Sequence, residues 1–493
     1  MGATAALGVS IVIAIAAAIA YDANAVEANA PPPLAVSLIL SVFGFFLTER
    51  MIIGAMPLFV KARISGIDLN KPQTKRDANG VLIRPYDGPI VPEAMGAVAC
   101  TVYLVCMFVF IPFPFMHNFA SWGAAGGGGA WGAAETAASR ATGGGWSVPW
   151  TQPSSSSSSG GGGHVALYSF PHAHLSKFLC ALLAICCMCF LGMADDVLDL
   201  RWRDRLWLPL AASLPLLMVY AVDGGGTVII LPKLLHALLG ASSIRLGLAY
   251  YFFMSCLAIF CTNSINILAG VNGLEVGQSV VIAATVLLNN AIQLWRWPEG
   301  PLHDNNLFSL YLVLPFLGVS LALLKLNWYP SRVFVGDTYC YFAGMTFAVA
   351  GILGHNTKTM LLFFVPQLLN FIYSLPQLFR LVPCPRHRMP GYLPRTDQLC
   401  NSYAEFEPSE LGRLGRVIFH GLERLRLARV ERTPGKSAVR MSNLTIINFA
   451  LYVLGPMHEA KLTSVLLLVQ IVSNALALFV RYHLAGYLYD IVK

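Results

Sequence analysis

The sequence predicts an all-α polytopic membrane protein with about ten transmembrane helices and an active site on the cytosolic face. Hydrophobic residues make up 56% of the 493-residue chain and charged residues only 12%, whereas soluble domains carry roughly 25% charged residues. Apolar runs of about 20 residues, each long enough to cross a bilayer, recur along the chain. Helices are expected because lipid requires every backbone polar group to be paired within the protein.

The first 33 residues are set apart from the rest of the chain. Residues 5–20 are apolar and rich in alanine, and Ala28-Asn-Ala30 resembles a signal-peptidase site. No basic segment precedes the apolar run, so a cleaved signal and an extra span are both open. We therefore expect the transmembrane domain to cover residues 34–493.

Ten spans are predicted in this domain. A segment rich in Gly, Ala and Ser at 121–163 cannot bury a core and indicates a disordered lumenal insert. Glu49 and Arg50 fall inside the first span, where we expect them to compensate each other's charge. The predicted spans are 34–58, 94–116, 174–193, 206–222, 247–268, 274–294, 306–326, 337–354, 358–379 and 461–484.

The net charge of +8 is informative through its distribution along the chain. If ten spans alternate, the loops 59–93, 194–206, 325–335 and 380–460 lie on one side and hold 23 of the 33 Lys and Arg residues. Basic loops favour the cytosol, so this side is predicted to be cytosolic, with 380–460 as a cytosolic loop region. This pattern argues against nucleic acid as a partner and for membrane lipid. The sequon Asn443-Leu-Thr445 is then cytosolic and should be unglycosylated.

Eleven cysteines are scattered along the chain, and three of them cluster at Cys186-Cys187-Met188-Cys189 inside an apolar run. We interpret this cluster as small apolar packing residues, without a disulfide or a metal site.

Three acids follow the apolar run 174–193. Asp195 and Asp196 are adjacent, and Asp199 lies within a helical turn of both. Carboxylates at a span end occur where water, a metal or a charged substrate meets the bilayer. The alternative is an ordinary helix end among headgroups, followed by arginines.

A second polar segment ends the span 247–268. Asn263 and Asn266 share a helix face, and Gly270 and Gly273 then allow the backbone to approach a ligand closely. The alternative is a helix–helix turn with polar caps. Three asparagines and Glu275 are more polar than such a turn requires.

Two further polar motifs fall on the predicted cytosolic side. Asp337 enters the span 337–354, where a lone Asp is typical of a helix N-cap. Pro385-Arg-His-Arg388 is a stiff cationic segment suited to a phosphate or sugar, or to anionic lipid. Acids and amides can hold Mg²⁺, and cations can neutralise a transferred phosphoryl group. Together the motifs indicate a diphosphate substrate without identifying it.

Four of these runs resemble one known family: Ala194-Asp-Asp-Val-Leu, the segment from Asn263 to Glu275, 327–344, and Pro385-Arg-His-Arg388. The chain is similar to the eukaryotic UDP-N-acetylglucosamine–dolichyl-phosphate N-acetylglucosaminephosphotransferases, of the polyprenyl-phosphate N-acetylhexosamine-1-phosphate transferase superfamily. The similarity runs from about residue 34 to the C-terminus, apart from the 121–163 insert. It implies transfer of GlcNAc-1-phosphate from UDP-GlcNAc to dolichyl phosphate at the endoplasmic reticulum membrane, with release of UMP. It also allows a homodimeric assembly.

The resemblance implies a role for each matching residue. Asn266 and Asp337 would ligate Mg²⁺ with the diphosphate, and Asp195 and Asp196 would be essential catalytic acids beside the acceptor phosphate. Whether either acts as a formal base is left open. The implied substrate-binding residues are Leu69, Gly270, Asn272 and Phe334 around uracil, Glu93 nearby, Arg205 on the diphosphate, and Arg386, His387 and Arg388 over the GlcNAc and diphosphate.

The chain departs from the family pattern at two positions. Arg205 stands where the family usually has a lysine. The positive charge is kept, but a planar guanidinium with donors in a fork replaces a compact ammonium group. Asp199 stands where relatives often have Asn. Two alternatives remain: a related transferase that uses another UDP-sugar, and a nucleotide-sugar transporter. A transporter would show a polar path through the midplane and repeat symmetry, and the sequence shows neither.

Overall fold

The computed structural model describes residues 32–69, 71, 74, 87–116, 172–198, 200, 204–223, 225–231, 233, 236, 240–385, 388–432 and 437–489. The predictions made for residues 1–31, for the insert 121–163, and for Asp199, Arg386 and His387 lie outside these described residues.

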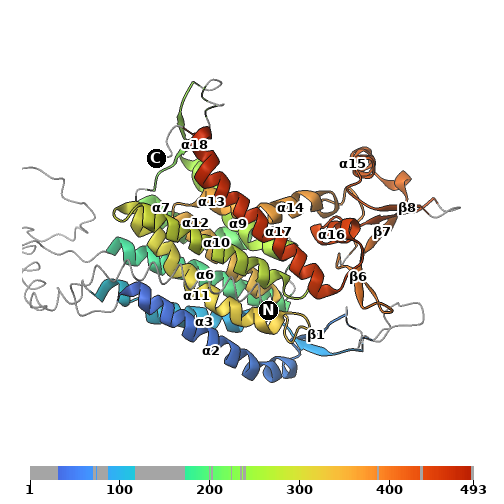
Figure 1. Ribbon diagram of the computed structural model, residues 1–493, viewed down its shortest axis with the longest axis horizontal. Helices are drawn as coiled ribbons and strands as arrows, with labels where there is room; N and C mark the ends of the chain where they lie inside the picture. Colours follow the sequence, from blue (N-terminus) through green and yellow to red (C-terminus); the bar gives the residue numbers. More distant parts are fainter. Residues whose placement is uncertain are drawn as a thin grey trace, which may run out of the picture.

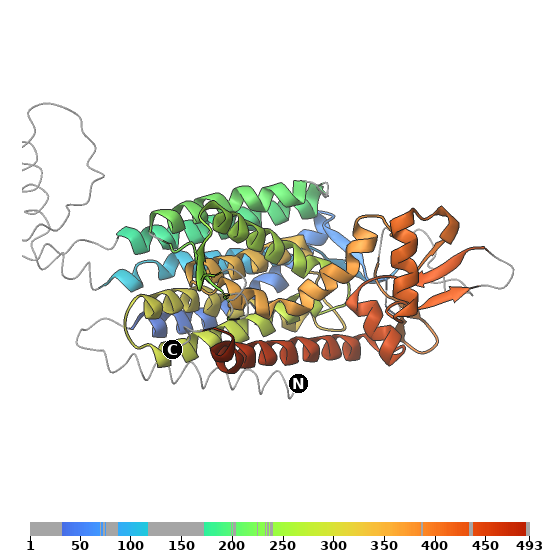
Figure 2. The same cartoon turned by 90° about the horizontal axis from the view of Figure 1, so that it is seen from above.

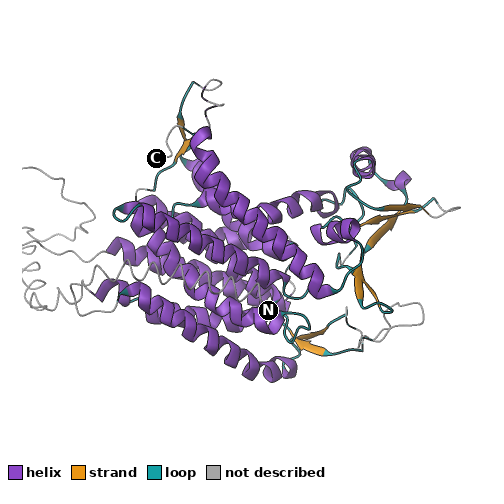
Figure 3. Cartoon of the chain, in the orientation of Figure 1, coloured by secondary structure: helices purple, strands orange, loops and turns teal. Residues whose placement is uncertain are grey.

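The described chain is mainly helical, with long helices side by side and most of the strands gathered at one end (Figures 1 and 3). The helices of the bundle are α2 (Pro33–Lys61), α3 (Gly96–Phe110), the 3-10 helix η2 (Phe113–Phe115), α6 (His172–Leu198), α7 (Asp204–Val222), α9 (Leu248–Ile267), α10 (Leu274–Arg296), α11 (Pro301–Asn327), α12 (Gly336–Leu353), α13 (Thr357–Phe363), α14 (Val365–Leu378), α17 (Glu459–Phe479), the π-helix η4 (Val480–Leu484) and α18 (Ala485–Leu488).

A helix lies in each of the ten ranges predicted to span the membrane. Among the described residues, seven helices are long and apolar enough to cross a membrane. The pair α13 and α14, bent by 68°, would make an eighth if it counts as one span. α7 and α12 lie outside this set, so the count of ten stays a prediction.

α12 is the central helix of the bundle. Every residue from Thr338 to Leu353 is buried, and α12 packs against α3, α6, α9 and α11. Glycines allow the closest of these contacts. A Cβ at Gly192 would lie 2.5 Å from Thr338 Cα, and one at Gly344 would lie 2.4 Å from Thr262 Cα. The C-terminal ends of α6 and α9 are thereby held against the N-terminal end of α12.

Two sequence expectations are wrong. Cys189 forms a disulfide with Cys100, because α3 and α6 pack side by side and bring together residues 89 positions apart. A local cluster of cysteines gives no sign of such a distant partner. Glu49 pairs with Lys325 of α11 at 2.6 Å instead of with the adjacent Arg50, because α2 packs against α11.

The predicted loop region 380–460 contains a folded subdomain (Figure 3). Its core includes Val382, Phe419, Met441 and Leu444, all buried. The sequon residue Asn443 is only 1% exposed, which leaves no room for a glycan. The subdomain elements are the β5–β6 hairpin (Gly391–Leu393 and Gln398–Cys400), the antiparallel sheet β7–β9–β8 (Tyr403–Phe406, Val439–Ser442 and Val430–Arg432), the 3-10 helix η3 (Pro408–Glu410), α15 (Arg413–Arg424) and α16 (Ile446–Leu454).

Two further hairpins connect the helices. β1 (Ser65–Ile67) pairs with β2 (Ile90–Pro92) between α2 and α3, on the side of the subdomain. β3 (Val228–Ile230) pairs with β4 (Ser243–Arg245) between α7 and α9, away from it. The bundle end that carries β1–β2 and the subdomain also carries the polar motifs.

Candidate active site

Asp195 lies in the last turn of α6 and is fully engaged by neighbouring donors. Its side chain is 0% exposed. Oδ1 accepts hydrogen bonds from the Leu200 backbone N–H at 3.0 Å and from Arg205 Nη2 at 2.9 Å, and Oδ2 accepts from the Tyr341 hydroxyl at 2.9 Å. A buried carboxylate requires such partners, because charge without them is costly to bury. Asp195 therefore fixes Arg205 at the start of α7.

Asp196 holds the N-terminus of α12. Oδ1 accepts from the Asp337 backbone N–H at 2.6 Å, and Oδ2 accepts from the backbone N–H and the hydroxyl of Thr338. These N–H groups belong to the first turn of a helix and have no partner within it. A carboxylate there is also favoured by the helix dipole. Asp196 thus caps α12 from a different helix and sets the position of Asp337.

Gly336 makes this contact sterically possible. Its φ of +73° lies in the left-handed region that favours glycine. A Cβ there would also lie 2.4 Å from Asp196 Oδ2 and 2.7 Å from Ala94 Cα. Any side chain at position 336 would therefore clash with Asp196 and Ala94.

Asp337 is the meeting point of three helices. Asn266 Nδ2, from the end of α9, donates to Asp337 Oδ1 at 2.6 Å. Arg205 Nη1 lies 3.3 Å from Asp337 Oδ2, so one guanidinium bridges Asp195 and Asp337. Asp195 and Asp337 thus share a single arginine, and with Asp196 beside them this cluster has an excess of negative charge that favours a bound cation.

The donor set of this cluster fits magnesium. Among the described residues, no group of three or more His, Cys, Asp and Glu side chains is placed to hold a metal by itself. Asp337 and Asn266 supply a carboxylate and an amide, which are oxygen ligands of the kind that Mg²⁺ prefers. Mg²⁺ usually completes its octahedron with water and substrate phosphates, so two protein ligands at the end of a bundle suffice.

Glu93 and Phe334 lie beside the acids because backbone hydrogen bonds join their segments. The Phe334 N–H donates to the Pro92 carbonyl at 2.8 Å, and the Met95 N–H donates to the Phe334 carbonyl at 3.1 Å. Partial burial raises the pKa of Glu93, and the nearby charge of Asp196 raises that pKa further. Glu93 is exposed, and its carboxylate lies close enough to Asp196 for the two charges to interact.

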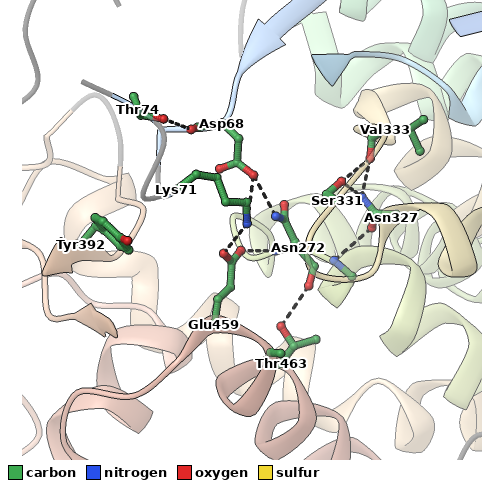
Figure 4. Close-up of polar contacts among 12 residues, drawn as sticks. Asp68, Lys71, Thr74, Asn272, Asn327, Ser331, Val333, Tyr392, Glu459 and Thr463 are labelled. Atoms are coloured by element: carbon green, nitrogen blue, oxygen red, sulfur yellow. Dashed lines mark hydrogen bonds and ion pairs between the residues drawn. The ribbon is translucent and has the colours of Figure 1, made fainter. Parts of the chain in front are cut away.

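A second polar cluster surrounds Asn272, in the turn between α9 and α10 (Figure 4). Its side-chain amide donates to Asp68 Oδ2 at 2.9 Å, and its backbone N–H donates to Glu459 Oε1 at 2.9 Å. Lys71 Nζ lies 3.2 Å from Asp68 and 2.9 Å from Glu459, so it forms an ion pair with both acids. The Thr463 hydroxyl donates to the Asn272 carbonyl at 3.0 Å. Two separate segments thus fix one asparagine, with Leu69 next to Asp68.

Hydrogen bonds through Asn327 connect the same turn to the segment that contains Phe334. The Gly273 N–H donates to Asn327 Oδ1 at 3.1 Å, and Asn327 Nδ2 donates to the Val333 carbonyl at 2.8 Å (Figure 4). Leu69, Gly270, Asn272 and Phe334 therefore come from three segments that hydrogen bonds connect. Gly270 also faces the subdomain, since a Cβ there would lie 3.2 Å from Met389 Cγ.

Arg388 carries a buried donor without a partner. Its Nη1 atom is buried and makes no hydrogen bond to any residue that the structure describes, and burial lowers the pKa of its guanidinium. Leaving such a donor unpaired costs about 1–3 kcal/mol. An anionic ligand would satisfy it. Arg386 and His387, its predicted companions, lie outside the described residues.

The structure brings the sequence-predicted residues into two groups. Asp195, Asp196, Arg205, Asn266 and Asp337 form one hydrogen-bonded cluster, with Glu93 beside it. Leu69, Gly270, Asn272 and Phe334 form the second group, which Arg388 approaches through Met389.

Sequence reasoning missed Tyr341, Lys71 and Glu459. Tyr341 lies one helical turn after Asp337, a spacing that could have indicated it. Lys71 is one of the basic residues of the loop 59–93, two positions after Leu69. Glu459 is a lone acid in the first turn of α17, which cannot be distinguished in the sequence from an ordinary helix start.

A membrane helix bundle with acids, an amide and an arginine joined at one end defines a class of membrane-embedded transferases. Residues 178–355 match the model of glycosyl transferase family 4. This segment contains Asp195, Asp196, Arg205, Asn266 and Asp337.

Proteins named UDP-N-acetylglucosamine–dolichyl-phosphate N-acetylglucosaminephosphotransferase match almost the whole chain. The protein of Schizosaccharomyces pombe is 42% identical over 460 residues, 93% of this chain and 94% of the relative. That of Saccharomyces cerevisiae is 40% identical over 461 residues, 93% of each chain. That of Dictyostelium discoideum is 38% identical, covering 92% of this chain and 91% of the relative. The chain belongs to this family, which confirms the resemblance found in the sequence motifs.

Proposed function

We propose that this protein transfers GlcNAc-1-phosphate from UDP-GlcNAc to dolichyl phosphate, giving GlcNAc-diphosphodolichol and UMP, the first step of the N-glycan lipid precursor. The observation that carries the proposal is the cluster in which Arg205 and Asn266 both contact Asp337, in a chain similar over 93% of its length to relatives named for this reaction. A phosphate oxygen of dolichyl phosphate attacks the phosphorus that bears GlcNAc. The bond from that phosphorus to the bridging oxygen breaks, and UMP leaves.

The protein groups position and neutralise charge in this reaction. Mg²⁺, when bound, supplies positive charge that offsets the charge of the diphosphate. Asp337 and Asn266 hold it, Asp196 fixes Asp337 through the start of α12, and Asp195 fixes Arg205. Neither Asp195 nor Asp196 has to remove a proton, because a phosphate dianion is already a nucleophile.

The Asn272 group and the segment 386–388 bind different parts of the UDP-GlcNAc donor. Leu69, Gly270, Asn272 and Phe334 frame the uracil, and Glu93 lies nearby. Arg386, His387 and Arg388 cover the GlcNAc and the diphosphate. The unpartnered Nη1 of Arg388 supports this division, because a diphosphate oxygen would accept its hydrogen bond.

We expect purified protein with UDP-GlcNAc, dolichyl phosphate and Mg²⁺ to form the lipid diphosphate and UMP in equal amounts. Chelation of the metal with EDTA should abolish the reaction, and added Mg²⁺ should restore it. Lipid product is measured by radiolabel and UMP by chromatography. Product at the full rate in EDTA would remove the metal from the proposal. Uptake of UDP-GlcNAc into sealed vesicles without lipid product would indicate a transporter.

The active site is proposed to face the cytosol from the endoplasmic reticulum membrane, supported by the basic loops on that side. A protease site inserted beside Ser437, in the β8–β9 hairpin, should be cut in sealed reticulum vesicles. The matched insertion beside Gly240, in the β3–β4 hairpin, should be cut only after detergent is added. The reverse pattern would place the site in the lumen.

A further inference from the structure

The subdomain core covers only part of the apolar surface of α15. Gly415 and Phe419 are buried on the inner face. Leu414, Val417 and Leu425, which directly follows the helix, are 59%, 69% and 69% exposed. Positions 414, 417, 421 and 425 follow helical spacing, so Leu414, Val417 and Leu425 form one outward stripe, with Gly421 between them.

Basic residues flank this outward stripe. Arg413, Arg416, Arg424 and Arg426 are exposed, and none of them forms an ion pair with another residue that the structure describes. The only acid between positions 413 and 426 is Glu423, which is paired with Arg432 at 2.6 Å. The outer surface of α15 thus has an apolar stripe with cationic side chains along one edge and at its C-terminal end, and it complements an anionic, apolar partner.

α15 packs beside the C-terminal end of α14, the bundle helix that leads into the subdomain. A Cβ at Gly415 would lie 2.2 Å from the carbonyl oxygen of Leu381, three residues beyond the end of α14. The Tyr373 hydroxyl of α14 donates to the Leu427 carbonyl at 2.5 Å. Next to it on α14, Ile372 is 52% exposed, as expected for a side chain that faces lipid. The segment after α15 is therefore level with the last turns of a bundle helix.

The direction of α15 fits this depth. In Figure 1 the helix is seen nearly end-on beyond α14, and in Figure 2 the same orange helix runs across the direction of the bundle helices. Membrane spans stand roughly along the bilayer normal, so a helix across them lies roughly parallel to the membrane surface.

We propose that α15 is an interfacial helix that binds the phospholipid surface at the active-site end of the bundle. Leu414, Val417 and Leu425 enter the boundary between headgroups and acyl chains, and the four arginines contact anionic phosphates. This contact anchors the subdomain, and with it the Arg388 segment, to the membrane beside the acid cluster.

The test uses the full-length protein in nanodiscs of phosphatidylcholine and phosphatidylserine, with a photoreactive benzoylphenylalanine at one position. At Val417 it should form a phospholipid adduct, detected by mass spectrometry, with a yield near that at Ile39, an exposed apolar residue of the α2 span. At Ser437, which is exposed in the β8–β9 hairpin, it should form none. A Val417 yield as low as that of Ser437 would overturn the proposal. So would a protein adduct in native membranes without a lipid adduct in nanodiscs.

The charges are tested separately by hydrogen exchange of residues 413–427. Exchange should be several-fold slower in nanodiscs with phosphatidylserine than in phosphatidylcholine alone. The difference should disappear in the quadruple variant Arg413→Gln, Arg416→Gln, Arg424→Gln and Arg426→Gln. Equal exchange of the unaltered protein in both lipids would contradict the role of the arginines.

Discussion

Replacement of Asp337 with asparagine should lower the rate of GlcNAc-1-phosphate transfer by about 1,000-fold. The amide keeps the shape of the side chain and its place beside Asn266, but it loses the charge that attracts a cation and one strong oxygen ligand. The rate should stay low as the Mg²⁺ concentration is raised, because the lost group is a ligand and a counter-charge together. Initial rates over a range of Mg²⁺ concentrations measure this.

The matched control for this variant is Asp304→Asn. Asp304 is also an acid in the first turn of a helix, α11, but it is exposed and lies outside the acid cluster. Its replacement should leave the rate unchanged. Ordinary transfer by the Asp337→Asn protein, with intact thermal unfolding in both variants, would remove Asp337 from the metal site.

Replacement of Arg205 with methionine should reduce both the stability and the rate. The Asp195 side chain, 0% exposed, would lose the cation that lies 2.9 Å away. Removing one partner of a buried pair costs about 3–5 kcal/mol. The low end applies here, because the Arg205 side chain is 23% exposed and solvent screens the pair. We expect a lower midpoint of thermal unfolding and a transfer rate lower by about 100-fold or more.

The variant Arg205→Lys separates the contribution of the positive charge from that of the guanidinium geometry. Lysine restores the charge, but a single ammonium cannot reproduce the fork in which Nη2 contacts Asp195 and Nη1 contacts Asp337. Its rate and unfolding midpoint should fall between those of Arg205→Met and the unaltered protein. A lysine variant no better than the methionine variant would show that positive charge contributes nothing without the guanidinium fork, and one equal to the unaltered protein would show that the fork is not needed.

The helices could be predicted because the bilayer imposes their length and their apolar composition. α7 and α12 show the limit of this signal. α12 begins with Gly336 and Asp337 and is buried by protein on all sides, so its composition reflects its protein neighbours as well as the membrane. The subdomain could not be predicted. Its strands have only three or four residues, and β7 pairs with β9 across a separation of more than 30 residues.

The acid cluster could be predicted in its membership but not in its arrangement. Asp195 and Asp196 are adjacent in the sequence, yet one fixes an arginine and the other caps α12. Nothing local distinguishes them, because their partners Tyr341 and Thr338 come from a helix more than 140 residues later. Local motifs and the family resemblance therefore identify most of the residues that meet, and the packing of α6 against α12 decides what each of them does.

The ion pair between Lys71 and Glu459 has a consequence for biogenesis. Its two residues are separated by 388 positions, so the ribosome completes nearly the whole chain before they can meet. Until α17 enters the membrane, Asn272 lacks the Glu459 and Thr463 contacts that hold it in place. A truncated chain, or one still being synthesised, therefore lacks the contacts that fix Asn272, a residue that we propose to frame the uracil.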